Sequence, residues 1–359
     1  MPKKNNLDDY SLNNSGTIPV LERHKLDLKK LCAYLESTIT GFSGPLELSE
    51  FKGGQSNPTY QLKTPKKNYV LRRKPPGVLL PSAHAVDREY TVITALKKQG
   101  FPVPQTHHLC LDEKIAGTIF YVMDEVAGHI YWDPFLSHLD NKTRLHLYTE
   151  KIKTLALLHS IDYKNIGLAD FGKTGNYFER QISRWSKQYR ASETETIPEM
   201  NHLMAFLEKN IPPDTRNTVV HGDYRLDNMV ISKDNTRIEA VLDWELSTIG
   251  SPIGDFTYHL MQWYLPQLGS NSIQALSEKE LLKLGIPTAK EYTALYCDFS
   301  NIKKINQLEL YLAYNFFRLA GILQGIIGRV RDGTAASKHA RRDISQVRLL
   351  AKAGWQLLN

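Results

Sequence analysis

The fold of this chain is decided by residues 219–230, which read Val219-Val220-His221-Gly222-Asp223-Tyr224-Arg225-Leu226-Asp227-Asn228-Met229-Val230. Two β-branched residues favour a strand that ends near His221, and the glycine after it favours a turn. The polar loop that follows carries Asp223 and, five positions later, Asn228. A second apolar run then ends at Asp243, twenty positions after Asp223. The pattern predicts a loop between short strands that presents a carboxylate, an amide and a second carboxylate.

Oxygen-bearing side chains in this order are typical of sites that transfer a phosphoryl group from a nucleotide. Mg²⁺ prefers oxygen ligands, and Asn228 and Asp243 carry amide and carboxylate oxygens that suit it. Asp223 carries a further carboxylate, which can accept the proton of an attacking hydroxyl group. The alternative is a polar turn in which these side chains bond only to nearby backbone. We favour catalysis because the three residues occur at the spacing of a kinase catalytic loop and its metal-binding strand.

The composition is that of a soluble globular protein. Its 359 residues can form two lobes with a large core, and 42% of them are hydrophobic. No apolar run approaches the roughly 18 residues that a membrane-spanning helix needs, so we expect no membrane span. Cys32, Cys110 and Cys297 are isolated and odd in number, which favours reduced thiols over disulfides or a metal site. We therefore expect a cytoplasmic protein.

The net charge of +7 permits several kinds of partner. A positive surface attracts nucleic acid, an anionic membrane surface or an anionic small molecule. Proteins that bind single-stranded nucleic acid combine basic grooves with stacking aromatic side chains, and this sequence has no basic run interleaved with aromatics. We expect a small-molecule substrate and no nucleic-acid partner.

The spacing of apolar residues divides the chain into a smaller strand-rich part and a larger helical part. We expect a flexible tail over residues 1–25, a strand-rich lobe over 26–127 and a helical lobe over 128–359. The expected strands are 46–48, 60–62, 69–72, 118–123, 219–220 and 240–242. The expected helices are 26–39, 85–98, 143–159, 178–189, 199–210, 255–264, 308–330 and 342–358. The predicted fold class is therefore α+β.

Three motifs, Val219–Asn228, Val241–Glu245 and Gly250–Phe256, together resemble those of the aminoglycoside phosphotransferase and choline kinase superfamily. The resemblance covers nearly the whole chain, residues 27–350, and implies a protein-kinase-like bilobal fold that uses ATP and Mg²⁺. The chain is most similar to phosphotransferase-like kinases related to the N-terminal domain of certain long acyl-CoA dehydrogenases. That closer similarity rests on Gly53–Tyr60, Tyr69–Gly77 and Arg88–Tyr90.

The resemblance also implies a role for each residue of the loop. Asp223 corresponds to the catalytic base, and Asn228 and Asp243 correspond to the Mg²⁺ ligands. His221 is expected to brace the loop, and Asp255 is expected to form hydrogen bonds with it from a following helix. For Asp255, the sequence alone leaves a second possibility open, a carboxylate that only stabilises the start of that helix.

Two segments are candidates for contact with the nucleotide. Gly53-Gly54-Gln55-Ser56-Asn57 lies between two expected strands, where glycine would let backbone amides cover phosphates. An ordinary hairpin turn is the alternative, since the segment lacks the Gly-x-Gly-x-x-Gly pattern. Met123, Asp124 and Val126 resemble a kinase hinge, in which the Asp124 carbonyl and the Val126 amide would contact adenine.

Arg72 ends the expected strand 69–72, where protein kinases carry a lysine that pairs with a glutamate of the next helix. A guanidinium group at this position can bind phosphate with two hydrogen bonds. Alternation along the strand places Arg72 on the face of Val70, so we expect Arg72, rather than Arg73, to point inward. Glu89 is its expected partner. The alternative is an exposed basic strand end and a solvated glutamate.

The acceptor of the phosphoryl group is expected to be a small anionic molecule. Asp243 precedes Trp244-Glu245 rather than Phe-Gly, and no long activation segment follows, which argues against a protein substrate. A hydroxyacyl-CoA would suit both the family resemblance and the basic C-terminal helices; the alternative for these helices is a solvated basic face. Aminoglycoside, choline or sugar phosphorylation and a non-catalytic, nucleotide-binding regulatory role are the alternatives. The basic residues are Arg318, Arg329, Arg331, Lys338, Arg341, Arg342, Arg348 and Lys352.

Overall fold

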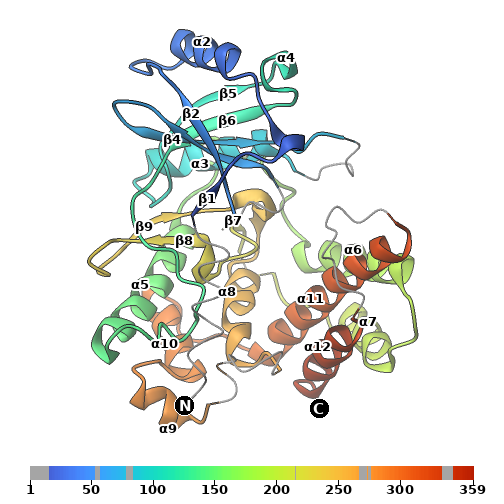
Figure 1. Ribbon diagram of the computed structural model, residues 1–359. Helices are drawn as coiled ribbons and strands as arrows, with labels where there is room; N and C mark the ends of the chain where they lie inside the picture. Colours follow the sequence, from blue (N-terminus) through green and yellow to red (C-terminus); the bar gives the residue numbers. More distant parts are fainter. Residues whose placement is uncertain are drawn as a thin grey trace. The chain divides into compact units, whose positions relative to one another are not determined.

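A computed structural model describes residues 16–52, 57–77, 84–214, 216–266, 273, 276–333 and 343–359 (Figure 1). The chain forms two compact units. The sheet unit comprises Met1–Asp133, Tyr163–Phe171 and Arg225–Ser247, and the helical unit comprises Pro134–Asp162, Gly172–Tyr224 and Thr248–Asn359.

This division corrects the simple boundary expected near residue 127. The strands β8 (Met229–Ile231) and β9 (Ile238–Val241) belong to the sheet unit because backbone hydrogen bonds attach them to it. His129 and Ile231 exchange two such bonds, of 2.7 and 2.8 Å, and the Val241 amide donates to the Pro102 carbonyl at 2.8 Å. Long-range pairing of this kind has no local sequence signal. The boundary predicted from the sequence therefore did not place β8 and β9 in the sheet unit.

The expected tail over residues 1–25 is also corrected where the structure describes it. Strand β1 (Thr17–Ile18) pairs with β2 (Glu47–Phe51), so this part of the chain extends the sheet. The Tyr60 hydroxyl donates to the His24 carbonyl at 2.8 Å, and the His24 ring lies 2.7 Å from Glu50. Residues 16–25 are therefore held by the sheet unit.

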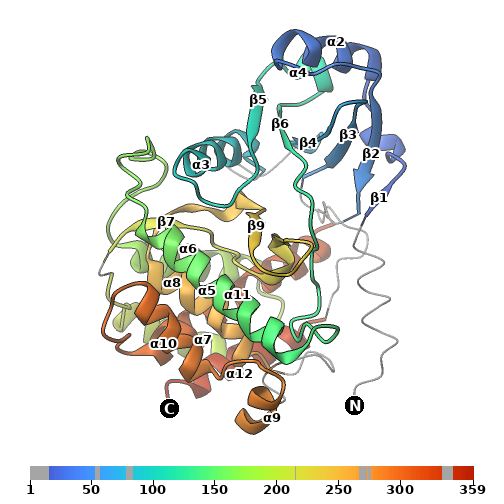
Figure 2. The same cartoon turned by 90° about the vertical axis from the view of Figure 1, so that its left-hand side faces the viewer.

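The sheet has six antiparallel strands in the order β1-β2-β3-β4-β6-β5 (Figures 1 and 2). The strand β5 was not expected from the sequence, and it contains His107 and His108. In the register, Tyr60 lies opposite Leu71, and Val70 lies opposite Met123. The remaining strand bounds are β3 (Thr59–Lys63), β4 (Asn68–Arg73), β5 (Thr106–Cys110) and β6 (Phe120–Asp124).

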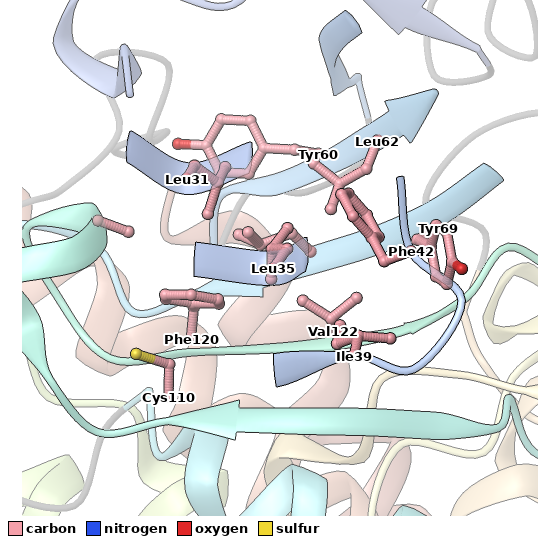
Figure 3. Close-up of a cluster of buried hydrophobic side chains, with 12 residues drawn as sticks. Leu31, Leu35, Ile39, Phe42, Tyr60, Leu62, Tyr69, Cys110, Phe120 and Val122 are labelled. Atoms are coloured by element: carbon pink, nitrogen blue, oxygen red, sulfur yellow. The ribbon is translucent and has the colours of Figure 1, made fainter. Parts of the chain in front are cut away.

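One face of this sheet packs on helix α2 (Leu28–Thr38), whose first turn is capped by the Asp27 carboxylate. Figure 3 shows Leu31 and Leu35 of this helix among the buried side chains of the strands. Burying a large aliphatic side chain contributes about 1.5–3 kcal/mol. Because Tyr69 and Leu71 of β4 face this core, alternation directs Val70 and Arg72 to the opposite face of the sheet. The sheet therefore directs the Arg72 side chain away from the core under α2.

The helical unit contains a second small ribbon, in which β7 (Thr218–Val220) pairs with β10 (Thr248–Gly250). Helices make up most of the rest of this unit. Two of them, α9 and α10, were not predicted from the sequence, although each begins with a capping box. Their bounds are α5 (Asn141–Ser160), α6 (Tyr177–Ser192), α7 (Pro198–Lys209), α8 (Pro252–Leu260), α9 (Glu278–Lys283), α10 (Ala289–Phe299), α11 (Leu308–Arg331) and α12 (Ser345–Gln356).

Helix α11 corrects the expectation that no apolar run reaches the length of a membrane span. It has 24 residues and is long and apolar enough by composition to cross a membrane. However, 78% of its apolar window is buried inside the protein, where it packs on α6, α8 and α12. Packing in the core of the helical unit accounts for its apolar composition.

Candidate active site

In the sheet unit, three acidic side chains converge on Arg72. The Arg72 Nε lies 2.9 Å from Glu89 Oε2, and the Arg72 Nη2 lies 2.5 Å from Asp243 Oδ1. Glu245 is more distant, with its Oε2 3.9 Å from Nη2. The expected pairing of Arg72 with Glu89, which lies on helix α3 (Val86–Lys98), is therefore confirmed.

Burial makes this cluster electrostatically unusual. The Glu89 side chain is fully buried, and the Tyr121 hydroxyl donates to it at 3.2 Å. Burial raises the pKa of Glu89 to about 7; Asp243 and Glu245 also raise this pKa, whereas Arg72 and Tyr121 oppose the shift. The pKa of Arg72 is raised because Glu89 and Asp243 outweigh the opposing effect of its burial. The guanidinium stays charged among three carboxyl groups.

Arg73 has a different environment, as alternation predicted. Its Nη1 donates to the Ala116 carbonyl at 2.7 Å, and its guanidinium lies 5.7 Å from the centre of the Tyr60 ring. Tyr60 belongs to the core under α2, so Arg73 points to the opposite face of the sheet from Arg72. Arg72, rather than Arg73, is therefore the arginine that contacts the acidic side chains.

The side chain of Asn57 is fully buried and connects two acids of this cluster. Its Nδ2 donates to Glu89 Oε1 at 3.1 Å and to Glu245 Oε2 at 3.3 Å. Its Oδ1 lies 3.0 Å from the ring nitrogen Nδ1 of His84. From the sequence, Asn57 was expected only to cover phosphates, and no local pattern indicated these contacts. The other expected members of that segment, Gly53, Gly54, Gln55 and Ser56, lie outside the described residues.

Asn228 and Asp243 lie at the same end of the β8–β9 ribbon. Met229 pairs with Val241, and the Leu242 amide donates to the Asn228 carbonyl at 2.8 Å. Asp243 follows immediately, in a left-handed conformation with φ +63°. The ribbon thus brings together the ends of its two strands, which carry the two expected metal ligands.

The donor set at this end suits Mg²⁺ that arrives with a nucleotide. One carboxylate and one amide oxygen are hard ligands, and the Asp243 side chain remains 32% exposed. Among the described residues, no group of three or more His, Cys, Asp or Glu side chains could hold a metal ion. Proteins usually bind Mg²⁺ through one or two carboxylates together with substrate phosphates, and these residues fit that pattern.

The expected hinge residues follow the end of strand β6. Met123 pairs with Val70, and the Asp124 amide donates to the Gln105 carbonyl at 2.8 Å. The Asp124 carboxylate contacts Lys67 at 2.7 Å and His107 at 2.6 Å. These two partners lower the pKa of Asp124, although its burial acts in the opposite direction.

The side chain of Asp124 is therefore engaged within the sheet unit, while the adenine contacts proposed for this segment involve backbone atoms. Val126, the third expected hinge residue, follows the strand and is partly buried. The Asp124 carboxylate is also the partner of the His107 ring, which lies beside it in the sheet.

In the helical unit, Asp255 holds the backbone of the His-Gly-Asp turn. It lies in the first turn of α8 and accepts hydrogen bonds from the amides of His221 at 2.7 Å and Gly222 at 2.8 Å. The expected bonding of the loop by Asp255 is thus confirmed. His159 Nε2 lies 3.2 Å from the same carboxylate. Burial raises the pKa of Asp255, but His159 and His221 outweigh it, so the pKa is lowered overall.

His221 and Tyr258 hold the next part of the loop. The fully buried His221 ring accepts the Asp223 amide at 3.2 Å through Nδ1, which fits its expected bracing role. The Tyr258 hydroxyl donates to Asp223 Oδ1 at 2.7 Å. Tyr258 lies three positions after Asp255 on α8, and this spacing could have suggested that both side chains reach the same loop.

Arg318 was expected only as one member of the basic C-terminal helices. In the structure, its Nη2 donates to the Gly222 carbonyl at 2.9 Å, and its guanidinium lies 4.9 Å from the centre of the Tyr258 ring. It lies on α11, almost a hundred residues beyond the loop, so no local pattern indicates this contact.

Sequence comparison relates the chain to phosphotransferases and to parts of larger proteins. A model of the phosphotransferase enzyme family matches residues 47–281. Acyl-CoA dehydrogenase family member 10 of Mus musculus is 41% identical over 341 residues, covering 95% of this chain and 32% of that protein. Family member 11 of Rattus norvegicus is 40% identical over 353 residues, covering 95% and 44%. The chain therefore spans less than half the length of these relatives.

Solved structures share the fold. A Ralstonia eutropha protein described as an aminoglycoside phosphotransferase is 43% identical, with a TM-score of 0.83 over 93% of this chain and 98% of that one. A choline kinase from Cryptosporidium parvum has a TM-score of 0.62 at 13% identity, over 92% and 95%. A spectinomycin phosphotransferase in complex with ADP and spectinomycin has 0.57 at 11%, over 93% and 99%. At such low identity, the last two show the protein-kinase-like fold alone.

Proposed function

Because this chain belongs to the phosphotransferase enzyme family, we propose that it is an ATP- and Mg²⁺-dependent kinase that phosphorylates a hydroxyl group of a small molecule. The observation that carries the proposal is the cluster in which Arg72 bridges Glu89 and Asp243. A buried arginine between a helix glutamate and a strand-end aspartate has the charges needed to bind phosphate oxygens near a metal ligand.

The reaction needs one bond to form and one to break. The hydroxyl oxygen of the acceptor attacks the γ-phosphorus of ATP, the bond from that phosphorus to the β–γ bridging oxygen breaks, and ADP leaves. Asp223 accepts the proton of the hydroxyl group. His221 and Asp255 keep the loop backbone in place, so that the carboxylate does not have to be ordered when the acceptor binds.

Asn228 and Asp243 are the residues that would hold Mg²⁺. The bound ion would neutralise charge on the phosphates as the terminal group is transferred. Arg72 would contact phosphate oxygens while Glu89 fixes its orientation. The backbone of Asp124 and Val126 is proposed to hold the adenine ring.

For the acceptor we propose a hydroxyacyl-CoA or another anionic hydroxy compound. The names of the relatives support acyl-CoA chemistry, although this chain matches only part of each. Aminoglycosides, choline and sugars are the alternatives within the same fold. A non-catalytic regulatory protein is the alternative of another class; the presence of Asp223, Asn228 and Asp243 argues against it.

A radiolabelled-phosphate screen tests the proposal. Wild-type protein with γ-labelled ATP and Mg²⁺ is offered 3-hydroxybutyryl-CoA, 3-hydroxybutyrate, kanamycin, choline and glucose. Asp223→Asn should lower transfer by roughly 100- to 10,000-fold, the usual contribution of a general base. Asp234→Asn, the same change at an exposed turn, serves as the matched control and should have no effect. Equal transfer by wild type and Asp223→Asn would overturn the catalytic assignment.

A further inference from the structure

Arg318 is a charged side chain that is 92% buried in the helical unit, since only 8% of it is exposed. Within the described residues, no carboxylate forms an ion pair with it, and the hydrogen bond to Gly222 is the only one that its guanidinium makes. Burying a charge without an ionic partner is costly. A buried charge of this kind close to a proposed catalytic residue is a candidate for contact with a ligand.

The position of Arg318 is set by the packing of α11 on α8, which are in contact (Figure 1). Asn315, one turn earlier on α11, donates to the Gly254 carbonyl at 3.0 Å and to Thr257 Oγ1 at 2.9 Å. Residues three apart on a helix share a face, so Arg318 is directed to the same side as Asn315. The packing of α11 on α8 in the core of the helical unit therefore holds Arg318 beside the His-Gly-Asp turn.

Arg318 is linked to the catalytic carboxylate through Tyr258. The guanidinium lies over the Tyr258 ring, and the hydroxyl of that ring donates to Asp223. Burial lowers the pKa of Arg318, but the fields of nearby tyrosines and Asp223 outweigh this effect, so the group stays charged. A permanent positive charge therefore lies close to the atom that would accept the proton of the acceptor.

This arrangement has opposite consequences for cationic and anionic acceptors. Recognition of a quaternary ammonium group commonly uses the face of an aromatic ring, and here the Tyr258 ring already has a guanidinium over it. A polycation or choline would also meet a buried like charge. A carboxylate or carbonyl oxygen near the reactive hydroxyl would instead find a hydrogen-bond donor with a full charge.

We propose that Arg318 is the residue that sets the charge preference of the acceptor site, favouring hydroxy acids and their derivatives over cationic alcohols. The proposal rests on the kinase function proposed above, in which Asp223 faces the acceptor. Tyr258 is a positioning residue in this scheme, because it connects Arg318 to Asp223 without itself carrying charge. Arg318 would contact the acceptor directly.

Kinetics with acceptors of opposite charge test this role. ADP release is measured for 3-hydroxybutyrate and 3-hydroxybutyryl-CoA against choline and kanamycin, with wild type, Arg318→Met, Arg318→Lys and Arg190→Met. Arg190 lies in the same unit, on α6, but is exposed and is not one of the basic residues of the C-terminal helices, so Arg190→Met is the matched control. Thermal unfolding of each variant checks that it is folded.

We expect Arg318→Met to raise the KM of the anionic acceptors by about 10- to 100-fold, the range for losing a charged hydrogen bond, with a smaller change in kcat. Arg318→Lys should retain the preference with an intermediate KM, and Arg190→Met should behave as wild type. If Arg318 only braces Gly222, Arg318→Met will instead lower kcat equally for all acceptors, which overturns the proposal.

The failure of this proposal is distinguishable from the failure of the kinase function. Wild-type turnover that favours choline or kanamycin overturns the role of Arg318 and leaves the kinase intact. The same holds if choline, kanamycin or glucose is phosphorylated and no anionic acceptor is. If MgADP binds but no acceptor in the panel is phosphorylated, the role of Arg318 is overturned and the non-catalytic nucleotide-binding alternative is favoured. If MgADP does not bind and no acceptor in the panel is phosphorylated, both proposals are wrong.

Discussion

The hydroxyl group of Tyr258 donates a hydrogen bond of 2.7 Å to Asp223, the carboxylate proposed as the catalytic base. Tyr258 and Asp255 lie on the same short helix, and Asp255 holds the two amides that precede Asp223. One helix therefore fixes both the backbone and the side chain of the loop. A base held in this way loses little orientational freedom when an acceptor binds.

The first prediction concerns Tyr258→Phe. Removing the hydroxyl takes one hydrogen bond from the Asp223 carboxylate, so we expect kcat to fall by about tenfold, consistent with a hydrogen bond to a charged group. The KM for ATP should be unchanged, because the nucleotide-binding residues belong to another part of the chain. Steady-state kinetics with the best acceptor of the screen measure both values.

Tyr311→Phe is the control for this variant. It also removes one hydroxyl hydrogen bond, to the Pro213 carbonyl at 2.9 Å, in the same unit. A fall in kcat of equal size in both variants would mean that Tyr258 acts only through stability.

The sequence predicted much of this fold because its main signals are local. The strands around 60–62 and 69–72 and the helix over 85–98 show clear periodicity, and alternation correctly directed Arg72 inward. The His-Gly-Asp turn was visible because glycine with φ +83° at Gly222 is needed there.

The missed features depend on tertiary contacts. Asn57 reaches Glu245 across 188 positions of sequence, and Arg318 reaches Gly222 across 96. The spacing of apolar residues around Asn57 or Arg318 does not indicate such a distant partner. The pairing of β8 and β9 with the sheet unit was missed for the same reason. Local spacing therefore identified the residues that are proposed to react, whereas their supporting side chains became apparent only in the folded chain.

The second prediction concerns Asp255→Asn. Asp255 accepts hydrogen bonds from two backbone amides, and an asparagine would turn its NH₂ group towards one of those donors. We expect a loss of about 1–3 kcal/mol in the free energy of unfolding, together with a large loss of kcat. Chemical denaturation and steady-state kinetics are the measurements. The same substitution at the exposed Asp298 of α10 is the control, and a variant with wild-type stability would contradict the bracing role.

The third prediction concerns Asn57→Ala. The variant leaves the buried Glu89 without one donor and separates it from Glu245, so Arg72 should be less well held. We expect the Kd for MgADP, measured by calorimetry, to rise by about 3- to 30-fold, in line with the loss of one or two hydrogen bonds. Asn201→Ala, at an exposed position of α7, should bind MgADP as wild type does.

A double-mutant cycle shows whether Asn57 acts through Glu89. If it does, Asn57→Ala should cost clearly less in the Glu89→Gln background than in the wild type. Additive effects would indicate instead that Asn57 acts independently of Glu89.

The last prediction is a pH dependence that originates in Glu89. Burial raises the pKa of Glu89 from its ordinary value of 4.5 to about 7 in the folded state; Asp243 and Glu245 contribute to the rise, and Arg72 opposes it. Between these two values, the folded protein holds a proton that the unfolded chain has already released. Stability therefore falls as the pH rises from about 4.5 to about 7 and changes little from this source above that range.

The measurement is the urea midpoint of the metal-free protein, in EDTA, at a series of pH values from 4.5 to 8. Because Glu89→Gln cannot ionise, its midpoint should fall less steeply with pH than that of the wild type across this window. Glu208→Gln, at an exposed position of α7, should keep the wild-type slope. Affinity for MgADP should show the opposite trend, rising as the pH passes 7, because ionised Glu89 holds Arg72 more firmly in place for phosphate. Identical slopes for wild type and Glu89→Gln would show that Glu89 is already ionised at pH 4.5 and that Arg72 outweighs its burial.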